Sequence, residues 1–180
     1  MPRSSRIFID CACYHITTRG NQKQEVFFLD EDYEKYIHTL KKAKRKYEIM
    51  LYAYCLMPNH VHLLIEANIS KNISKLMHWL TRGYTEYHNT KYQKVGHLWQ
   101  GRFKNHPIIK GRYLVNAATY IENNPVRASI VNDPADYKWS SYRERCLLSK
   151  RHILDPMKMD CSFIPLGDTF IEQKRGHLQS

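Results

Sequence analysis

Residues 49–66, IMLYAYCLMPNHVHLLIE, contain two apolar segments of strand length joined by a short Met-Pro-Asn connection. Proline and asparagine favour a tight turn here, so the two segments are expected to pair as an antiparallel hairpin. Side chains in a strand alternate between its two faces, which places His60 and His62 on one face and Val61 and Leu63 on the other. We therefore expect the second strand to bury its apolar face against helices and to carry both histidines on the opposite face.

The segments around this hairpin alternate between strand and helix patterns. In chain order, strands are predicted at 11–18, 49–56, 60–66 and 97–109, and helices at 30–47, from Ser70 or Ser74 to Tyr87, and at 111–123. The third helix must stop or kink near Pro125, because proline clashes with the preceding turn. This order is that of the split-βαβ, ferredoxin-like arrangement, which common RNA-binding domains share. We predict an α+β fold with an antiparallel sheet of four to five strands and helices packed on one face.

The length of 180 residues suits one domain with a single core. Regular patterns extend as far as residue 145, so we assign residues 1–145 to that domain. Residues 146–180 mix proline, glycine, charged and scattered apolar residues, which is typical of a loosely packed or partly disordered extension. No two of the five cysteines form a CxxC motif. We therefore expect free thiols, without disulfides and without a structural zinc site.

The composition is strongly basic. Lys and Arg number 28 against 17 Asp and Glu, which gives a formal net charge of +11. Such a charge attracts polyanions, chiefly nucleic acid or an anionic membrane surface. The membrane alternative is disfavoured, since no run approaches the roughly 18 apolar residues that span a bilayer and the N-terminus lacks the apolar core of a signal peptide. We expect a cytoplasmic protein.

His60 and His62 are about 6–7 Å apart at Cα by strand rise, close enough for both imidazoles to reach one cation. Histidine is a common metal ligand, but pairs with this spacing also occur on solvated strands, so the pair alone leaves both interpretations open. A zinc hydrolase would need another His, Cys or carboxylate, and Glu66 lies too far along the strand to serve well. A third ligand must come from elsewhere in the chain.

Residues 120–128, YIENNPVRA, offer both such a ligand and a nucleophile. Tyr120 and Asn124 are four residues apart, so one helical turn puts the phenol and the carboxamide on one face. The carboxamide oxygen suits a hard divalent cation, and a phenol oxygen can attack a phosphate whose charge that cation neutralises. The alternative is structural: Tyr120 packs in the core, and Asn124 caps the helix before Pro125.

Five segments together resemble one known family. The sequence is similar to the REP-associated tyrosine transposases, in the single-tyrosine branch of the HUH (His-hydrophobic-His) nucleases. The matching segments are YHITTRGNQKQEVF at 14–27, YCLMPNHVHLLIE at 54–66, LWQGRFKNHPI at 98–108, YIENNPVRA at 120–128 and YKWSSY at 137–142. They fall within roughly residues 5–145, and five segments in the same order are far more specific than HVH alone.

The resemblance implies a metal-dependent, single-stranded DNA endonuclease and strand-transferase. Its metal ligands correspond to His60, His62 and Asn124, which would hold Mg²⁺ or Mn²⁺, and its nucleophile corresponds to Tyr120. The implied substrate is single-stranded DNA beside a hairpin derived from a dispersed repeat, and the implied intermediate is a 5′-phosphotyrosine. The resemblance also implies a bacterial cytoplasmic location at the nucleoid, no membrane contact, and a monomer in preference to a helix-swapped dimer.

Binding of single-stranded DNA needs cationic groups beside aromatic or planar surfaces. The candidate DNA-binding residues are Arg19, Asn21 and Gln22 after the first strand, Arg102 and Lys104 in the fourth, Arg112 at the start of the third helix, and Arg127 after the turn at Pro125. The resemblance favours Arg19 and Arg102, because both lie in matching segments. Which of these residues contact phosphate and which contact bases stays open.

Three further histidines, His15, His97 and His106, lie in strand-like segments. We expect structural roles for them, although one of them could orient a metal ligand or transfer a proton. The main alternative to nuclease activity is a nucleic-acid-binding protein of the same fold that no longer cleaves. Histidines stand on the third strand where stacking aromatic rings would be expected of an RNA-binding domain, which favours the nuclease.

Overall fold

The computed structural model describes residues 9–146 and 151–157 of the chain. Its elements, in chain order, are β1 (Cys13–Arg19), η1 (Asn21–Lys23), α1 (Asp30–Lys46), β2 (Ile49–Met57), β3 (His60–Ala67), α2 (Lys71–Tyr92), β4 (Lys104–Ile108), α3 (Arg112–Glu122), α4 (Asn124–Arg127), η2 (Pro134–Asp136) and α5 (Tyr142–Arg145). Apart from β4, the strands and the three long helices lie where the hydrophobic patterns predict them, to within a few residues at their ends.

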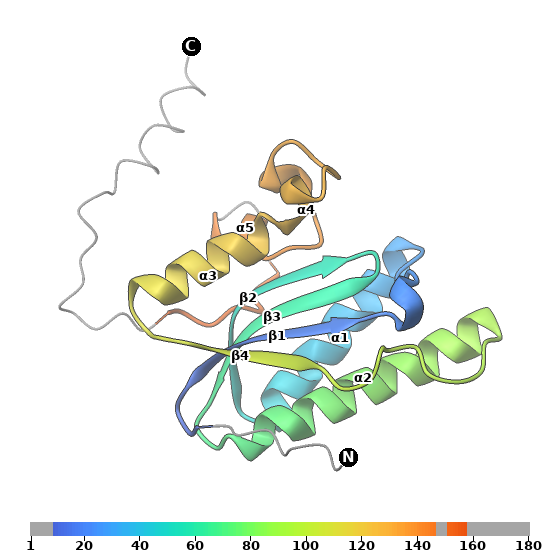
Figure 1. The fold of residues 1–180 in the computed structure, drawn as a ribbon, viewed down its shortest axis with the longest axis horizontal. Helices are drawn as coiled ribbons and strands as arrows, with labels where there is room; N and C mark the ends of the chain where they lie inside the picture. Colours follow the sequence, from blue (N-terminus) through green and yellow to red (C-terminus); the bar gives the residue numbers. More distant parts are fainter. Residues whose placement is uncertain (1–8, 147–150, 158–180) are drawn as a thin grey trace.

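The four strands form one antiparallel sheet in the order β2-β3-β1-β4 (Figure 1). β2 and β3 are the predicted hairpin, with Met57 opposite His60 at the turn. β1 pairs with β3 and not with β2, the next strand in sequence, which is the split-βαβ arrangement. The predicted α+β class and antiparallel sheet are confirmed.

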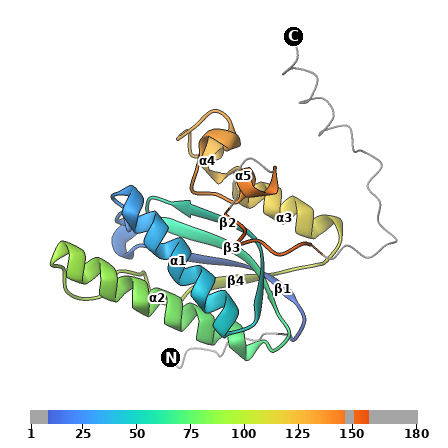
Figure 2. The same ribbon diagram turned by 180° about the vertical axis from the view of Figure 1, so that it is seen from behind.

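α1 and α2 cover one face of the sheet and enclose the main core (Figure 2). Their inward stripes include Tyr36 and Leu40 of α1 and Leu80 and Tyr84 of α2, all of which are buried. These residues recur at helical spacing, so each helix turns one continuous apolar stripe to the sheet. Removing this apolar area from water is the dominant favourable contribution to folding.

α3 lies on the opposite face of the sheet, where it contacts β2 and β3 (Figure 1). The expectation that the helices pack on one face is therefore corrected for α3. Because α1 and α2 fill the other face, α3 packs on this one. It buries an apolar stripe of its own here, which consists of Leu114, Ala118 and Ile121. The histidine face is partly covered as a result, and His62 is only 7% exposed.

The fourth strand is shorter than predicted. Within the described residues, the segment 97–103 is irregular and pairs with the sheet only through the bridge of Trp99 with Gly20. Gly101 has a φ of 65°, a left-handed conformation that glycine adopts at low cost and that interrupts a strand. Trp99 is buried against α2 and does not alternate outward. The predicted strand at 97–109 is therefore wrong over residues 97–103.

Residues 137–146 fasten α3 to the sheet. The Tyr54 amide donates to Ser141 Oγ over 3.0 Å, so this segment runs beside β2. The Ser141 hydroxyl and the Arg145 guanidinium both donate to the buried carboxylate of Glu122, at 2.5 and 3.0 Å. Because Glu122 is the last residue of α3, these contacts set the position of the helix end that carries Tyr120.

The predicted extension at 146–180 is described only at residue 146 and at 151–157. The second stretch packs on α1 and β2: Ile153 is buried, and Asp155 forms an ion pair of 2.7 Å with Lys44. The rest of the predicted extension lies outside the described residues.

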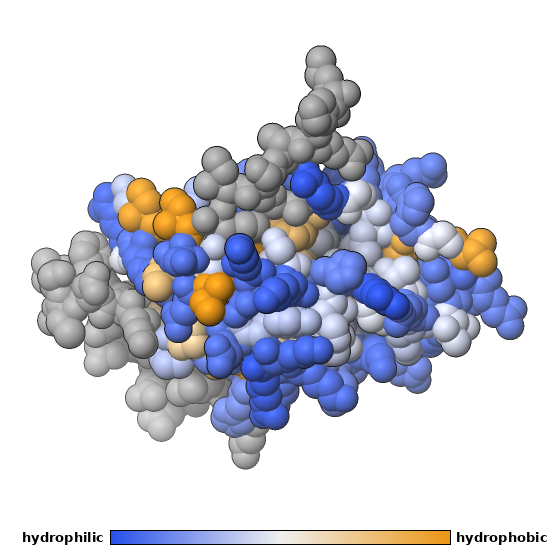
Figure 3. Space-filling view, turned by 90° about the horizontal axis from the view of Figure 1, so that it is seen from below, coloured by the Kyte–Doolittle hydropathy of each residue, from blue (hydrophilic) through white to orange (hydrophobic). Residues whose placement is uncertain are grey.

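The face seen from below is mostly hydrophilic, with scattered apolar side chains (Figure 3). This face suits a polar or charged partner better than an apolar one. In the part of the chain that the structure describes, no helix is both long enough and apolar enough to cross a membrane.

Candidate active site

His60 and His62 stand at the start of β3, on the sheet face that α3 partly covers. Their ring centroids are 4.8 Å apart and their planes meet at 81°. His60 is half-buried, whereas His62 is buried. The two imidazoles are thus side by side, as the alternation of β3 predicts, at a separation that lets both reach one cation.

Each of these imidazoles has a hydrogen-bond partner at Nδ1. His60 Nδ1 donates to Asn59 Oδ1 over 2.6 Å, and His62 Nδ1 lies 2.8 Å from His15 Nε2. In a neutral imidazole whose Nδ1 donates, Nε2 carries the lone pair, so these contacts leave Nε2 of both rings for a ligand. His62 Nε2 is buried and has no hydrogen-bond partner among the described residues, a costly state unless a ligand completes it.

Burial keeps these imidazoles neutral. Desolvation lowers the pKa of His60 to about 4, with a further contribution from Arg19. Desolvation also lowers the pKa of His62 to about 3, and the neighbouring His60 and His15 add to this shift. Metal ions bind neutral imidazole, so at neutral pH neither ring has to lose a proton before it can ligate.

Tyr120 approaches the pair from α3 of the same chain. Its ring centroid lies 6.1 Å from that of His15, in an edge contact, and the ring of His15 lies 5.0 Å from that of His62. Tyr120 is 45% exposed, so its phenol is not part of the core and is accessible to a substrate. The Arg127 guanidinium lies 4.6 Å over the phenol ring, a cation–π contact that restrains the ring.

Asn124 lies one helical turn beyond Tyr120, at the junction of α3 and α4. Its carboxamide nitrogen donates to the carbonyl oxygens of Tyr120 and Ile121, at 3.0 and 3.2 Å. The amide nitrogen therefore caps the helix, and the carboxamide oxygen remains as an acceptor. The hydrogen bonds show the predicted helix cap, and the role of Asn124 as a metal ligand stays a prediction.

The donor set fits a divalent cation. Across residues 9–146 and 151–157, no three His, Cys, Asp or Glu side chains group in a way that could hold a metal. The carboxamide of Asn124 is a donor type that suits Mg²⁺ or Mn²⁺ beside two imidazoles, and its role as a ligand stays a prediction. The orphaned Nε2 of His62 is the observation that most directly calls for such a ligand.

Several of the predicted DNA-binding residues lie around this site. Arg19 ends β1 directly opposite His60, and Asn21 and Gln22 follow it in η1. Arg127 lies over the Tyr120 ring. Arg19 is therefore adjacent to the histidine pair, with Asn21 and Gln22 close behind it in the chain, and Arg127 is adjacent to the phenol.

The other predicted DNA-binding residues are more widely spread. Lys104 begins β4 opposite Thr17, while Arg102 precedes it at the same edge of the sheet. Arg112 begins α3, about 12 Å from Tyr120 by helical rise, and lies over the ring of Tyr113. Arg112 is thus about two helical turns from Tyr120 along α3, and its role in DNA binding stays a prediction.

His15 has a larger part in the site than its sequence context indicates. It contacts both His62 and Tyr120, and burial, with the neighbouring His106, lowers its pKa to about 4. Its strand-like surroundings favoured a structural role. The sequence did contain a signal for this role, because His15 lies in one of the segments that resemble the family. Alternation within β1 shows which residues share a face with His15, but it does not show that this face meets His62 and Tyr120.

Several known proteins are similar to this chain. Residues 9–124 match the family described as IS200-like transposases. A curated relative from Haemophilus influenzae, described as a REP-associated tyrosine transposase, is 28% identical over 126 residues, which make up 64% of this chain and 71% of that protein. A solved structure, described as a REP-associated tyrosine transposase bound to a REP hairpin, aligns with a TM-score of 0.69 and 21% identity over 93% of this chain and 98% of that chain. The resemblance to REP-associated tyrosine transposases is confirmed.

Proposed function

The chain belongs to the family of IS200-like transposases, and on this premise we propose that it cleaves and rejoins single-stranded DNA with Tyr120 as the nucleophile. The observation that carries the proposal is an exposed phenol on the same sheet face as two neutral, adjacent imidazoles. All of these groups come from one chain, so one folded molecule contains the complete set.

A divalent cation would be held by His60 Nε2, His62 Nε2 and the carboxamide oxygen of Asn124. Mixed nitrogen and oxygen donors suit Mn²⁺ better than Mg²⁺ by ligand preference. When bound, such a cation withdraws charge from the phosphate oxygens and makes phosphorus easier to attack. The hydrogen bonds from the two Nδ1 atoms would keep both rings oriented for this task.

In the chemical step, Tyr120 Oη forms a bond to phosphorus while the bond from phosphorus to the 3′ oxygen of the neighbouring nucleotide breaks. The phenol loses its proton and the departing oxygen takes one up, so the products are a 5′-phosphotyrosine and a free 3′-hydroxyl. Arg127, over the phenol ring, adds positive charge where the phosphate has to sit. The covalent link retains the energy of the broken ester, so a second 3′-hydroxyl can reverse the step and complete strand transfer.

We propose as substrate a DNA in which the cleaved single strand adjoins a hairpin. The solved relative with the TM-score of 0.69 is described as bound to a REP hairpin. The net charge of +11 suits a polyanion, and we propose that Arg19, Lys104 and Arg127 contact its backbone.

A covalent adduct tests the proposal. The protein is incubated with labelled hairpin oligonucleotides that carry single-stranded extensions, in Mn²⁺ or in EDTA, and the products are separated on a denaturing gel. We expect an adduct in Mn²⁺, none in EDTA, and none in the Tyr120→Phe variant, because phenylalanine lacks the attacking oxygen.

Tyr113→Phe is the matched control, since Tyr113 is on the same helix and is 51% exposed. It should form the adduct as the unsubstituted chain does. An adduct that survives in Tyr120→Phe would mean that another tyrosine is the nucleophile. Binding of the DNA with no adduct in the unsubstituted chain would instead favour a DNA-binding protein that no longer cleaves.

A further inference from the structure

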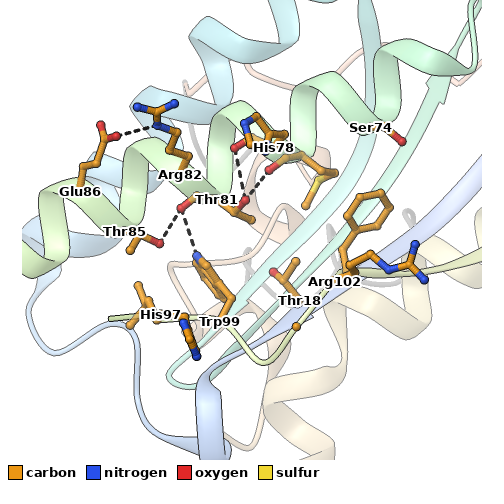
Figure 4. Close-up of a pocket in the computed structure, with 14 residues that line it drawn as sticks. Thr18, Ser74, His78, Thr81, Arg82, Thr85, Glu86, His97, Trp99 and Arg102 are labelled. Carbon is orange, nitrogen blue, oxygen red and sulfur yellow. Dashed lines mark hydrogen bonds and ion pairs between the residues drawn. The ribbon is translucent and has the colours of Figure 1, made fainter. Parts of the chain in front are cut away.

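A groove of about 660 Å³ lies between α2 and residues 97–103 (Figure 4). One wall is the stripe of α2 between Ser74 and Glu86, and the other is the irregular segment with Trp99. Since α2 covers the sheet face opposite α3, the groove is on the other side of the sheet from Tyr120. Its size is within the range of sites that bind small ligands.

The groove combines an apolar wall with a cationic rim. Of the apolar side chains that line it, Phe103 is half-buried, whereas Met77 and Trp99 are buried, and Trp99 Nε1 donates to Thr81 O over 3.2 Å. The cationic or ionisable side chains that line it are Arg82, His78, His97 and Arg102. Arg82 and Arg102 stand toward opposite ends of the groove (Figure 4).

The charge of the groove favours an anionic ligand. Glu86 is the one acidic side chain among the described lining residues, and it is already paired with Arg82 at 2.8 Å. A flat apolar surface flanked by cations is the combination that holds an unpaired nucleotide, because the base takes the apolar surface and the phosphate takes the charge.

The floor of the groove offers a polar contact as well. Thr18 lines the groove and is 5% exposed, and its hydroxyl interacts with the hydroxyl of Tyr36. A hydroxyl can donate one hydrogen bond and accept two, so the edge of a base can bond to Thr18 as well.

The groove and the active site adjoin the same end of β1. Arg19 lies opposite His60 in the sheet, and the next residue, Gly20, pairs with Trp99 of the groove wall. β4 is the edge strand, so a DNA strand that leaves the histidine face can pass Lys104 and turn around this edge into the groove. In the described sheet, β4 is the one strand between β1 and this edge.

We propose that the groove between α2 and residues 97–103 binds unpaired nucleotides that adjoin the cleaved phosphate. The inference rests on the proposed function and adds to it a second DNA contact, outside the active site, through which sequence beside the hairpin would be selected. The segment LWQGRF at 98–103, which the cleavage chemistry does not use, then has a function of its own.

Filling the groove tests this proposal. Thr85 lines the groove and Thr90 is an exposed residue of the same helix outside it, so Thr85→Trp and Thr90→Trp form a matched pair. Both are made in the Tyr120→Phe chain so that cleavage does not intervene. Affinity is measured by fluorescence anisotropy for labelled hairpins with a 5′ extension, with a 3′ extension, and with blunt ends.

We expect Thr85→Trp to weaken binding of at least one extended hairpin by about tenfold or more, the size of a lost base-stacking contact. Thr85→Trp should leave the affinity for the blunt hairpin unchanged. Thr90→Trp should leave the affinities for all three hairpins unchanged. Equal affinities of the two variants for both extended hairpins would overturn the proposal.

A cross-link in the unsubstituted chain provides a measurement that no folding defect can affect. 5-Iododeoxyuridine is placed in the unpaired extension, and the irradiated complex is mapped by mass spectrometry. Cross-links within 97–103 are expected, while cross-links confined to the histidine face would overturn the groove even if Tyr120 forms its adduct. Groove-dependent binding with no Tyr120 adduct would instead refute cleavage and leave the groove as a DNA contact.

Discussion

At the scale of single residues, His15 connects the two halves of the active site. Its Nε2 lies 2.8 Å from His62 Nδ1, and its ring meets the edge of Tyr120. A hydrogen-bond acceptor at Nδ1 fixes the tautomer and the ring orientation of a histidine whose Nε2 is to ligate a metal. His15 is therefore expected to be a positioning residue that acts through His62.

Replacing His15 by phenylalanine is expected to weaken Mn²⁺ binding by about 10- to 100-fold, the usual effect of removing such a partner. The phenylalanine ring keeps the packing but accepts no hydrogen bond. The affinity is measured by titration calorimetry without DNA, so the result does not depend on cleavage. His15→Gln, whose amide oxygen can accept from Nδ1, should recover part of the loss.

His106→Phe is the control for this substitution, because the ring of His106 lies 6.4 Å from that of His15 without a hydrogen bond to the metal site in the described residues. It should leave the Mn²⁺ affinity within about twofold of the original. If His15→Phe behaved in the same way, His15 would be a packing residue only.

The buried imidazoles also predict how stability depends on pH. The pKa values of His15 and His60 are lowered to about 4 and that of His62 to about 3, whereas an unfolded histidine titrates near 6.5. Between about pH 6.5 and 4 the unfolded chain binds more protons, so the free energy of unfolding falls as the pH falls. Each histidine contributes at most ~1.4 kcal/mol per pH unit, and less for the half-buried His15 and His60.

Urea denaturation of the metal-free protein at pH 7, 6 and 5 measures this dependence. His62→Gln should have a shallower decline than the original chain, because it removes one of the three groups. Asp32 does not affect the measurement between pH 7 and 5. Burial raises the pKa of its carboxyl, but hydrogen bonds from Lys91 and Tyr92 outweigh this and lower it, so the stability that Asp32 contributes is lost only below about pH 4. Parallel declines in the two proteins would mean that His62 is not buried as a neutral ring.

The residues of the site differ in how far the sequence predicts them. Alternation within one strand is local, so His60 and His62 can be paired from their spacing, and helical spacing does the same for Tyr120 and Asn124. The contact of His15 with His62 depends on the register between β1 and β3, which is not local. A shift of one residue in that register would turn His15 to the other face.

At the scale of elements, the end of α3 depends on an ion pair between the buried Glu122 and the more exposed Arg145. Burial raises the pKa of the Glu122 carboxyl, and the Arg145 guanidinium and the Ser141 hydroxyl counteract this. Arg145 also donates to Tyr52 O over 2.7 Å, which ties the pair to β2. Tyr120 is two residues before Glu122, so this anchor holds Tyr120 over the sheet.

Arg145→Met is expected to lower the free energy of unfolding by roughly 3 kcal/mol, because it leaves a buried carboxylate without its counterion. Arg143→Met, on the same short helix, should cost about 0.5 kcal/mol or less. Urea denaturation at pH 7 measures both. Adding Glu122→Gln to Arg145→Met should restore most of the loss, since the amide carries no charge.

An equal cost for the two arginine variants would mean that Glu122 is already protonated in the folded state. In that case the apolar stripe alone would hold α3 on the sheet.

The elements were predictable where one pattern dominates. The stripes of α1 and α2 and the alternation of β2 and β3 persist over many residues, and these elements lie where they are predicted, although α2 continues to Tyr92, five residues beyond its predicted end. The 97–103 segment alternates as a strand would, but Gly101 takes a left-handed conformation and Trp99 packs on α2, which no local pattern indicates. The face chosen by α3 is also a tertiary property, set by the space that α1 and α2 leave.

At the scale of the whole molecule, the site is assembled within one chain. The contact of Tyr120 with His15, and the anchoring of α3 by Arg145, join α3 to the sheet of its own chain. The sequence does not distinguish this arrangement from one in which two chains exchange α3, because the same residues would meet in both. That the molecule acts as a monomer stays a prediction.

Mixing two inactive variants separates these arrangements. Tyr120→Phe lacks the nucleophile and His62→Gln lacks a metal ligand, and the two are unfolded and refolded together before the adduct assay. If each site is built within one chain, every site in the mixture carries a defect, so no adduct above that of either variant alone is expected. If two chains exchanged α3, half of the refolded dimers would be mixed, each with one complete site of two, and about a quarter of the original activity would return. The unsubstituted chain, refolded in the same way, shows that activity survives the procedure, and a recovery near that quarter would overturn assembly within one chain.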